Sequence, residues 1–146
     1  MKYIAIVLVL MSYMYASGSH GGGHENMDMG GKKMAHWTAP KYEANKKNPI
    51  HYSDNSVKKG KQLFKANCAS CHGINADGKG SMAKYFKTKP ADLIKMSNNH
   101  KDGDFFWKIK TGKGDMPGFK NKLAQNDIWN LVNFIQSLSK KSGSHH

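Results

Sequence analysis

The sequence predicts a small all-α domain, and three observations support this prediction. Apolar residues near the C-terminus recur at the spacing of one buried helix face. They are Ile128, Leu131, Val132, Ile135 and Leu138. A second, narrower apolar face lies in the middle of the chain, and no segment shows the alternation of apolar and polar residues that is typical of strands. The 146 residues suffice for one such domain with targeting and tail segments.

The first 18 residues are typical of an export signal. Lys2 gives a positive start, residues 3–15 form an apolar stretch, and residues 16–18 are small, as a cleavage site requires. The apolar stretch is shorter than the ~20 residues that span a bilayer as a helix. We expect residues 1–18 to be a cleaved signal peptide, with an uncleaved membrane anchor as the alternative. The rest of the chain is then periplasmic or otherwise exported.

A flexible linker and an extended arm are expected at residues 19–52. Glycine and polar residues dominate the linker, whereas residues 37–52, called the arm below, carry two prolines and scattered aromatics. We expect the arm to pack on the domain without a core of its own. Histidine and methionine suit copper, so copper handling is a minor hypothesis beside a simple tether. The linker residues concerned are His20, His24, Met27, Met29, Met34 and His36.

The domain is expected at residues 53–141, followed by a tail at 142–146. Ser53 or Ser56 is expected to cap a helix that runs to about Asn67. Gly60, at the centre of its apolar face, indicates that another backbone crosses closely there. Further helical segments are expected at 82–86, 92–96 and 104–110, and the C-terminal helix should end near Lys140.

One short motif carries the predicted chemistry. Cys68 and Cys71 are two residues apart, and His72 follows at once, as in the pentapeptide of c-type haem attachment. Two thioethers must reach two vinyl groups of one haem, and this spacing on a helical turn places both sulfurs on one edge. The histidine then projects toward the iron. The motif predicts one covalently bound haem c.

Other uses of the two cysteines are less favoured. A thioredoxin-like redox pair needs a strand–helix–strand setting, and a zinc site needs further cysteines or histidines at paired spacing. His100 is the only other histidine within residues 53–141, and its polar neighbours predict a solvated loop.

The region 53–140 resembles the class I c-type cytochromes, particularly the short single-haem domains of bacterial respiratory chains. Gly60 and Phe64 precede the first cysteine as in the N-terminal helix of that family. Leu131 and Phe134 match the pair that its C-terminal helix presses against the first. The resemblance implies a small cytochrome c fold in which these helices cross and short helices and loops wrap around one haem.

The same resemblance implies further groups around the haem. Pro90 with Leu93 resembles the segment whose proline carbonyl accepts the N–H of the proximal histidine. Met116-Pro117 resembles the loop of the sixth iron ligand. One departure is that the chain has no arginine for the haem propionates, so lysines, Trp107 or backbone groups would have to serve.

Met116 is the expected sixth ligand among three methionines that follow the motif. Met82 stands close to His72 in the sequence, and Met96 is expected to pack in the core. Met116 lies in an irregular loop whose following proline fixes the backbone. A thioether ligand raises the reduction potential of the iron relative to ligation by two histidines, and it fills the sixth coordination position. We therefore expect an electron carrier, with a peroxidase-type haem enzyme as the alternative if the sixth position is open.

The charge predicts the kind of partner. All 23 basic residues are lysines, and with 10 acidic residues the net charge is +13. The lack of arginine disfavours nucleic-acid and phosphate binding. Lysines flank the Met116 loop, so redox partners with an acidic docking surface are expected, although solubility alone would also explain the charge. The expected role is electron transfer between respiratory partners, as a free carrier or as a haem subunit of a larger oxidoreductase.

Overall fold

The structure, a computed structural model, describes residues 37–142. The predictions for the signal peptide, for the linker with its copper hypothesis, and for all but the first residue of the tail lie outside these residues. No strand is present in the described range, which agrees with the all-α prediction, and no described helix meets the length and hydropathy that a membrane span requires. The elements are α1 (Lys41–Ala44), α2 (Asp54–Asn67), α3 (Ala69–His72), the 3-10 helix η1 (Ala83–Tyr85), α4 (Leu93–Ser97), α5 (Asp102–Thr111) and α6 (Gln125–Ser142).

The start of α2 follows from its sequence. The Ser53 hydroxyl accepts a hydrogen bond from the Ser56 N–H, and the Ser56 hydroxyl accepts one from the Ser53 N–H, which completes a capping box. This arrangement satisfies backbone donors that the first turn of a helix leaves without partners. Of the two predicted caps, Ser53 is the N-cap.

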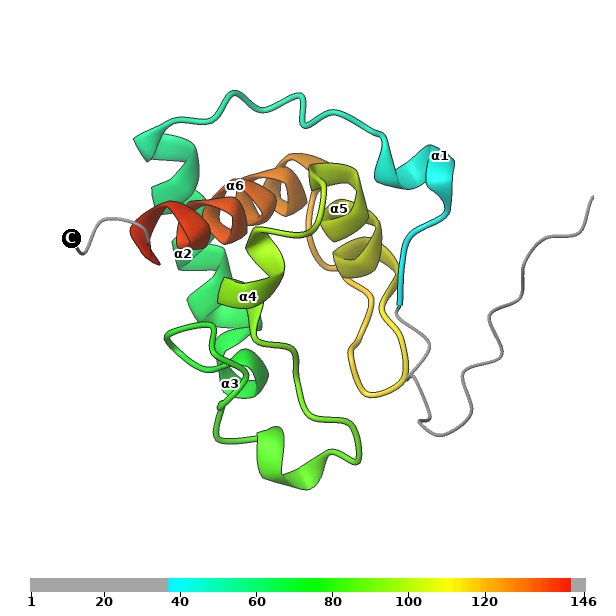
Figure 1. Ribbon diagram of the computed structural model, residues 1–146, viewed down its shortest axis with the longest axis vertical. Helices are drawn as coiled ribbons and strands as arrows, with labels where there is room; N and C mark the ends of the chain where they lie inside the picture. Colours follow the sequence, from blue (N-terminus) through cyan, green and yellow to red (C-terminus); the bar gives the residue numbers. More distant parts are fainter. Residues whose placement is uncertain (1–36, 143–146) are drawn as a thin grey trace, which may run out of the picture. The chain divides into compact units, whose positions relative to one another are not determined.

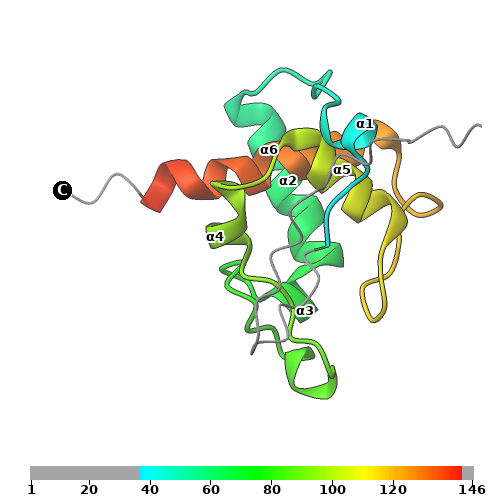
Figure 2. The same cartoon turned by 45° about the vertical axis from the view of Figure 1, so that its right-hand side comes forward.

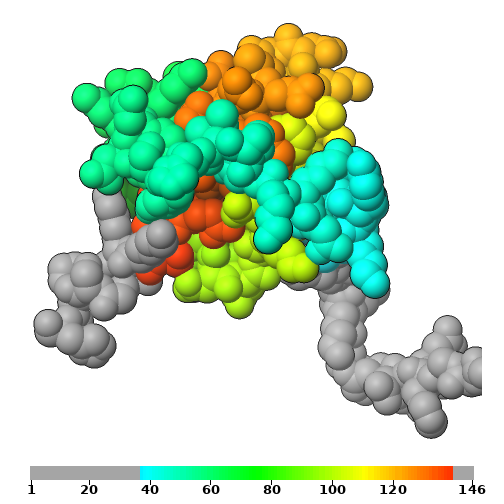
Figure 3. Space-filling view, turned by 90° about the horizontal axis from the view of Figure 1, so that it is seen from above, coloured from blue at the N-terminus to red at the C-terminus, as the bar shows by residue number. Residues whose placement is uncertain are grey.

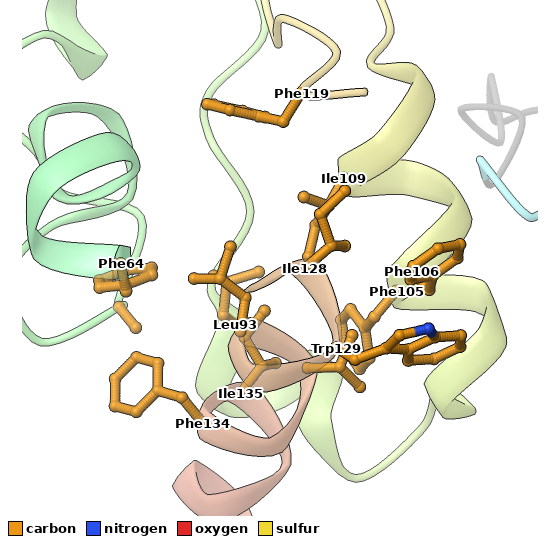
Figure 4. Packing of buried hydrophobic residues seen from close by; sticks show 13 residues of the cluster. Phe64, Leu93, Phe105, Phe106, Ile109, Phe119, Ile128, Trp129, Phe134 and Ile135 are labelled. Atoms are coloured by element: carbon orange, nitrogen blue, oxygen red, sulfur yellow. The ribbon is translucent and has the colours of Figure 1, made fainter. Parts of the chain in front are cut away.

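The crossing of α2 with α6 forms one half of the core. A Cβ on Gly60 would collide with the carbonyl oxygen of Asn130 in α6, so the two backbones touch where the sequence predicted a crossing. Next to this point the rings of Phe64 and Phe134 lie 5.1 Å apart. Figure 4 shows Phe64 on α2 facing Phe134 on α6. The predicted crossing of N- and C-terminal helices is confirmed.

The helix α5 packs on the opposite side of α6 and forms the other half of the core. Phe106 stacks on Trp129 with ring centroids 3.9 Å apart and an interplanar angle of 13°. Phe105 and Ile109 are buried in the same cluster, as Figure 4 shows. Figure 1 shows α6 between α2 and α5, so one helix provides the apolar surface on which both others rest.

The arm lies along α5 and α6. Figures 1 and 2 both place α1 beside α5, and in Figure 3 the cyan arm residues lie directly against the yellow-green segment. The Asn48 side-chain amide donates to the Trp129 carbonyl oxygen (3.2 Å) and to Asn133 Oδ1 (2.9 Å). The Asn133 amide in turn donates to the Ile50 carbonyl oxygen (3.2 Å). The arm packs on the domain, and it includes the short helix α1, which the sequence did not predict.

Candidate functional site

The two cysteines and the histidine lie on one helical turn at the end of α2. The N–H of Cys68 donates to the Phe64 carbonyl oxygen (2.8 Å), which continues α2 up to the first cysteine. The N–H groups of Cys71 (3.1 Å) and His72 (2.9 Å) both donate to the Cys68 carbonyl oxygen. The three side chains therefore have the helical arrangement that the pentapeptide predicted.

The His72 ring is held by one backbone carbonyl. Its Nδ1 lies 3.0 Å from the Ala91 oxygen, and because a carbonyl can only accept, Nδ1 carries the proton. The acceptor is thus Ala91 and not Pro90, so the expectation of a proline carbonyl is wrong by one residue. Burial lowers the pKa of His72, and the bond to Ala91 offsets part of this effect. The ring is neutral at pH 7, and its Nε2 lone pair is available to a metal.

The segment between His72 and α4 is folded by backbone contacts. The Gly80 N–H donates to the Cys71 carbonyl oxygen (3.1 Å), and the Leu93 N–H donates to that of Ala76 (2.8 Å). Gly78 lies against the Pro90 carbonyl oxygen, with no room for a Cβ. Leu93 is buried in the core cluster. Pro90 and Leu93 thus help to hold the stretch of backbone from which the Ala91 carbonyl oxygen reaches His72.

Both thiols are free in the described chain and partly buried. Burial, with a smaller contribution from the Cys71 charge, raises the pKa of the Cys68 thiol to about 12. No group of three or more His, Cys, Asp or Glu side chains suited to a metal ion occurs within residues 37–139. Two thiols on one helical turn and one oriented neutral imidazole do not form a zinc site, but they are the groups that covalent haem attachment requires.

Met116 lies in a tight loop fixed to the end of α5. The Lys113 N–H donates to the Met116 carbonyl oxygen (2.9 Å), and the Met116 N–H donates to that of Lys113 (3.1 Å). Gly112 has a φ of 69° and lies against Gly118, which closes the base of the loop. Figure 1 shows this loop (yellow) and α3 on the same side of α6, standing apart from each other.

The other two methionines differ from Met116 in their surroundings. Met82 is exposed, and Met96 packs against the core cluster, as the sequence predicted for it. Met116 is partly buried and also contacts the core cluster.

The lysines near the Met116 loop are not all equivalent. Lys113, Lys120 and Lys122 are exposed, and Lys110 is half-buried over the Phe106 ring. A cluster of positive charge therefore surrounds the loop at the surface. Lys108, in contrast, is buried within α5 and is not part of the solvated surface.

The prediction of a solvated loop for His100 is wrong. The His100 side chain is only 9% exposed, and its Nδ1 lies 2.6 Å from Asp104 Oδ2. Lys108 Nζ contacts the same oxygen at 2.7 Å. Polar neighbours in the sequence suggested exposure, yet here they partner one another. The spacing of four residues between successive members was the available signal.

Comparisons with known proteins agree with the chemistry of this site. The cytochrome c family model matches residues 57–139. The chain is similar to cytochrome c6 of Cyanidium caldarium (32% identity over 92 residues, 63% of this chain and 79% of the relative). It is also similar to cytochrome c6 of Petalonia fascia (28% over 85 residues, 58% of this chain and 95% of the relative).

A solved structure supports the same fold. A chain of the reducing HAO-like protein complex of Kuenenia stuttgartiensis aligns with a TM-score of 0.55 and 26% identity. The alignment covers 62% of this chain and 46% of that chain, so the present chain spans less than half of its neighbour. The family match extends from a point within α2 to a point within α6 and includes the two cysteines and the histidine. The chain belongs to the cytochrome c family and is an electron carrier, not an enzyme, with one covalently bound haem c.

Proposed function

We propose that this cytochrome is an exported carrier that passes single electrons between respiratory partners through an iron ligated by His72 and Met116. One observation carries the proposal: the His72 Nδ1–H is fixed on the Ala91 carbonyl oxygen (3.0 Å), which leaves Nε2 as the donor atom. Such a second hydrogen bond fixes the tautomer and the ring orientation of a metal-ligating histidine.

Cys68 and Cys71 are the proposed attachment residues. Their placement on one turn, immediately before His72, supports thioether bonds to a single group. Pro90 and Leu93 are proposed to hold the segment around Ala91 in place, Pro90 through its backbone contact with Gly78 and Leu93 through the core. When bound, haem supplies one-electron exchange at its iron, and the chain supplies attachment, ligand orientation and exclusion of water.

Met116 is the proposed sixth ligand because its loop has little freedom. The paired hydrogen bonds with Lys113 and the closed base at Gly112 and Gly118 hold the backbone on both sides of the thioether. A thioether ligand favours ferrous iron and leaves no position for peroxide. This ligation is consistent with an electron carrier.

Exposed lysines beside the loop support an acidic docking partner. Lys113, Lys120 and Lys122 would attract such a partner over a distance that shortens as salt screens the charges, from ~10 Å at 0.1 M to ~3 Å at 1 M. We expect the bimolecular electron-transfer rate to fall as salt rises. Charge reversal at Lys113 and Lys120 should lower both the rate and its salt dependence.

The proposed organisation extends beyond the described residues. Residues 1–18 are assigned to a signal peptide, residues 19–52 to the linker and arm, residues 53–141 to the haem domain and residues 142–146 to the tail. A cleaved signal places the domain in the periplasm or another extracytoplasmic space, whereas an uncleaved one would tether it to the membrane.

A second candidate role is that of a haem subunit in a larger oxidoreductase. The observation that favours it is the solved neighbour, which is a chain of a protein complex. Size-exclusion chromatography of the protein from its source, followed by haem staining, separates the two roles. A free carrier elutes as a small protein, and a subunit co-elutes with larger polypeptides.

The ligand assignment is tested with Met116→Ala, and Met82→Ala serves as a matched control. The wild-type ferric protein should show the weak far-red absorption band of thioether-ligated iron, and its ferrous form should not bind carbon monoxide readily. Met116→Ala should lose the band and bind carbon monoxide, whereas Met82→Ala should behave as wild type. Retention of the band in Met116→Ala would show that another residue is the ligand.

A further inference from the structure

The arm contacts α5 at its first turn. Gly103 approaches the backbone of the arm so closely that a Cβ would collide with the Glu43 carbonyl oxygen. Beside this point Lys101 Nζ donates to Asn45 Oδ1 (2.8 Å). The end of α1 and the beginning of α5 are therefore in direct backbone contact.

A buried charged cluster holds the arm at Ala39, just before α1. The Ala39 N–H donates to Asp104 Oδ1 at 2.7 Å, and the other carboxylate oxygen receives Lys108 Nζ at 2.7 Å. Both side chains of the ion pair are about 5% exposed. Asp104 binds the arm with one oxygen and α5 with the other. If the arm detached, Asp104 Oδ1 would lose its hydrogen bond from the Ala39 N–H.

Trp37, at the start of the described arm, contacts residues toward the C-terminal end of α5. Its ring lies 6.2 Å from the Trp107 ring at an angle of 59°. Lys108 Nζ lies 5.7 Å from the centre of the Trp37 ring, and Lys113 Nζ lies 5.9 Å from it. Lys113 belongs to the Met116 loop, so Trp37 contacts both the helix and the loop that follows it.

The Met116 loop is tied to the same helix end. The Phe119 N–H donates to the Ile109 carbonyl oxygen (3.0 Å), and the Lys120 N–H donates to that of Lys110 (3.2 Å). These bonds fix the returning side of the loop. On the outgoing side, Lys113 both pairs with the Met116 backbone and approaches the Trp37 ring.

We propose that Trp37 is a positioning residue that keeps the Met116 loop closed and thereby keeps Met116 on the iron. The proposal rests on Met116 being the sixth ligand. The contact between the Trp37 ring and the Lys113 ammonium exists only while the loop is closed, so it adds to the free energy that opposes opening. Attraction between an exposed ammonium and an indole face corresponds to about a two- to fivefold change in an equilibrium constant.

The experiment measures loop opening through an added ligand. Imidazole binds ferric iron only where Met116 has left, so its apparent affinity for the ferric holoprotein reports the fraction of open loop. The titration is followed by the loss of the far-red band, at a pH where imidazole is uncharged. Trp37→Ala should raise the apparent affinity about two- to fivefold, and Trp37→Phe, which keeps a ring, should raise it less. Tyr42→Ala, an exposed aromatic of the same arm, should leave it unchanged.

A double-variant cycle separates positioning from general stability. Lys113→Gln removes the loop cation, so it should raise the affinity by itself, and Trp37→Ala should then have a smaller effect than in the wild type. Equal affinity of Trp37→Ala and wild type, or an unchanged effect of Trp37→Ala in the Lys113→Gln background, would overturn the proposal. Should Trp37→Ala fail to fold, Trp37→Phe and Lys113→Gln still complete a cycle.

Met116→Ala distinguishes this proposal from the ligand assignment on which it rests. It should bind imidazole far more tightly than any arm variant, because no thioether competes. If Met116→Ala binds imidazole as wild type does, the ligand assignment fails. If it binds tightly while the arm variants match wild type, the ligand assignment stands and the role of Trp37 fails.

Discussion

Two contacts within this domain differ in kind: the crossing of α2 with α6 and the contact of the arm with α5. The centre of the crossing of α2 with α6 is apolar and depends on a missing side chain, since Gly60 lies against the Asn130 carbonyl oxygen. The contact of the arm with α5 also includes a close backbone approach at Gly103, but it has a buried carboxylate, Asp104, that binds Ala39 and Lys108. The first is stabilised by burying surface, whereas the second requires every partner to be present.

Because the two contacts differ in kind, different substitutions should weaken them. An apolar crossing loses stability gradually as its shape is spoiled, because neighbouring groups can shift. A buried ion pair loses more when one member is removed, because the remaining charge has neither water nor a partner. The two contacts should therefore respond differently to substitution and to pH.

The largest effect is expected from Asp104→Ala. This change leaves the Lys108 ammonium buried without its carboxylate, and breaking a buried pair in this way costs about 3–5 kcal/mol. Denaturant unfolding of the holoprotein, followed by circular dichroism, measures the change. Asp115→Ala, at an exposed carboxylate, is the matched control and should have little effect.

A double variant sharpens this test. Asp104→Leu with Lys108→Met replaces the pair by apolar groups, so it should be less destabilised than Asp104→Leu alone. A double variant that is as unstable as the sum of its two single variants would show that the ion pair is not the source of the stability.

A smaller effect is expected from Gly60→Val at the apolar crossing. The new side chain must displace α6 at Asn130, and such overpacking costs about 1–3 kcal/mol. Lys61→Val, at an exposed position of the same helix, isolates the helix propensity of valine and should cost about 0.5 kcal/mol. Equal unfolding midpoints for the two variants would refute a close crossing at Gly60.

The smallest effect is expected from acid acting on Asp104. Burial alone would raise the pKa of Asp104, but the hydrogen bonds from Lys108 and Ala39 and the nearby positive charges hold it below 3.8. A carboxyl whose pKa is lowered by folding stabilises the fold above its unfolded pKa, and this contribution is lost as the pH falls through the folded value.

The direction of this pH dependence can be measured by comparing the stability of the wild type with that of Asp104→Asn. The difference between their free energies of unfolding should be constant near neutral pH and should shrink below about pH 4. A difference that stays constant down to the acid transition would mean that the charge of Asp104 does not stabilise the arm.

The features that could be predicted from the sequence are those that depend on residues close together in the chain. The motif Cys68–His72 needs only one helical turn, and the apolar periods of α2 and α6 needed no knowledge of their partners. Gly60 was informative because a glycine inside a helix is costly unless something requires the space. The family resemblance drew on the same local patterns, and the family match confirms it.

The contacts between residues far apart in the chain could not be predicted and became visible in the folded structure. The acceptor for His72 is 19 residues away, and one peptide unit separates the expected Pro90 from the observed Ala91. Ala39 and Asp104 are 65 residues apart, and neither residue carries a local sign of the other. The polar neighbours of His100 in the sequence predict exposure to water, yet the side chain is buried because the fold brings its partners within hydrogen-bond distance. Hydrophobic periodicity is a property of one helix, whereas hydrogen-bond pairing is a property of two segments, and only folding brings those segments together.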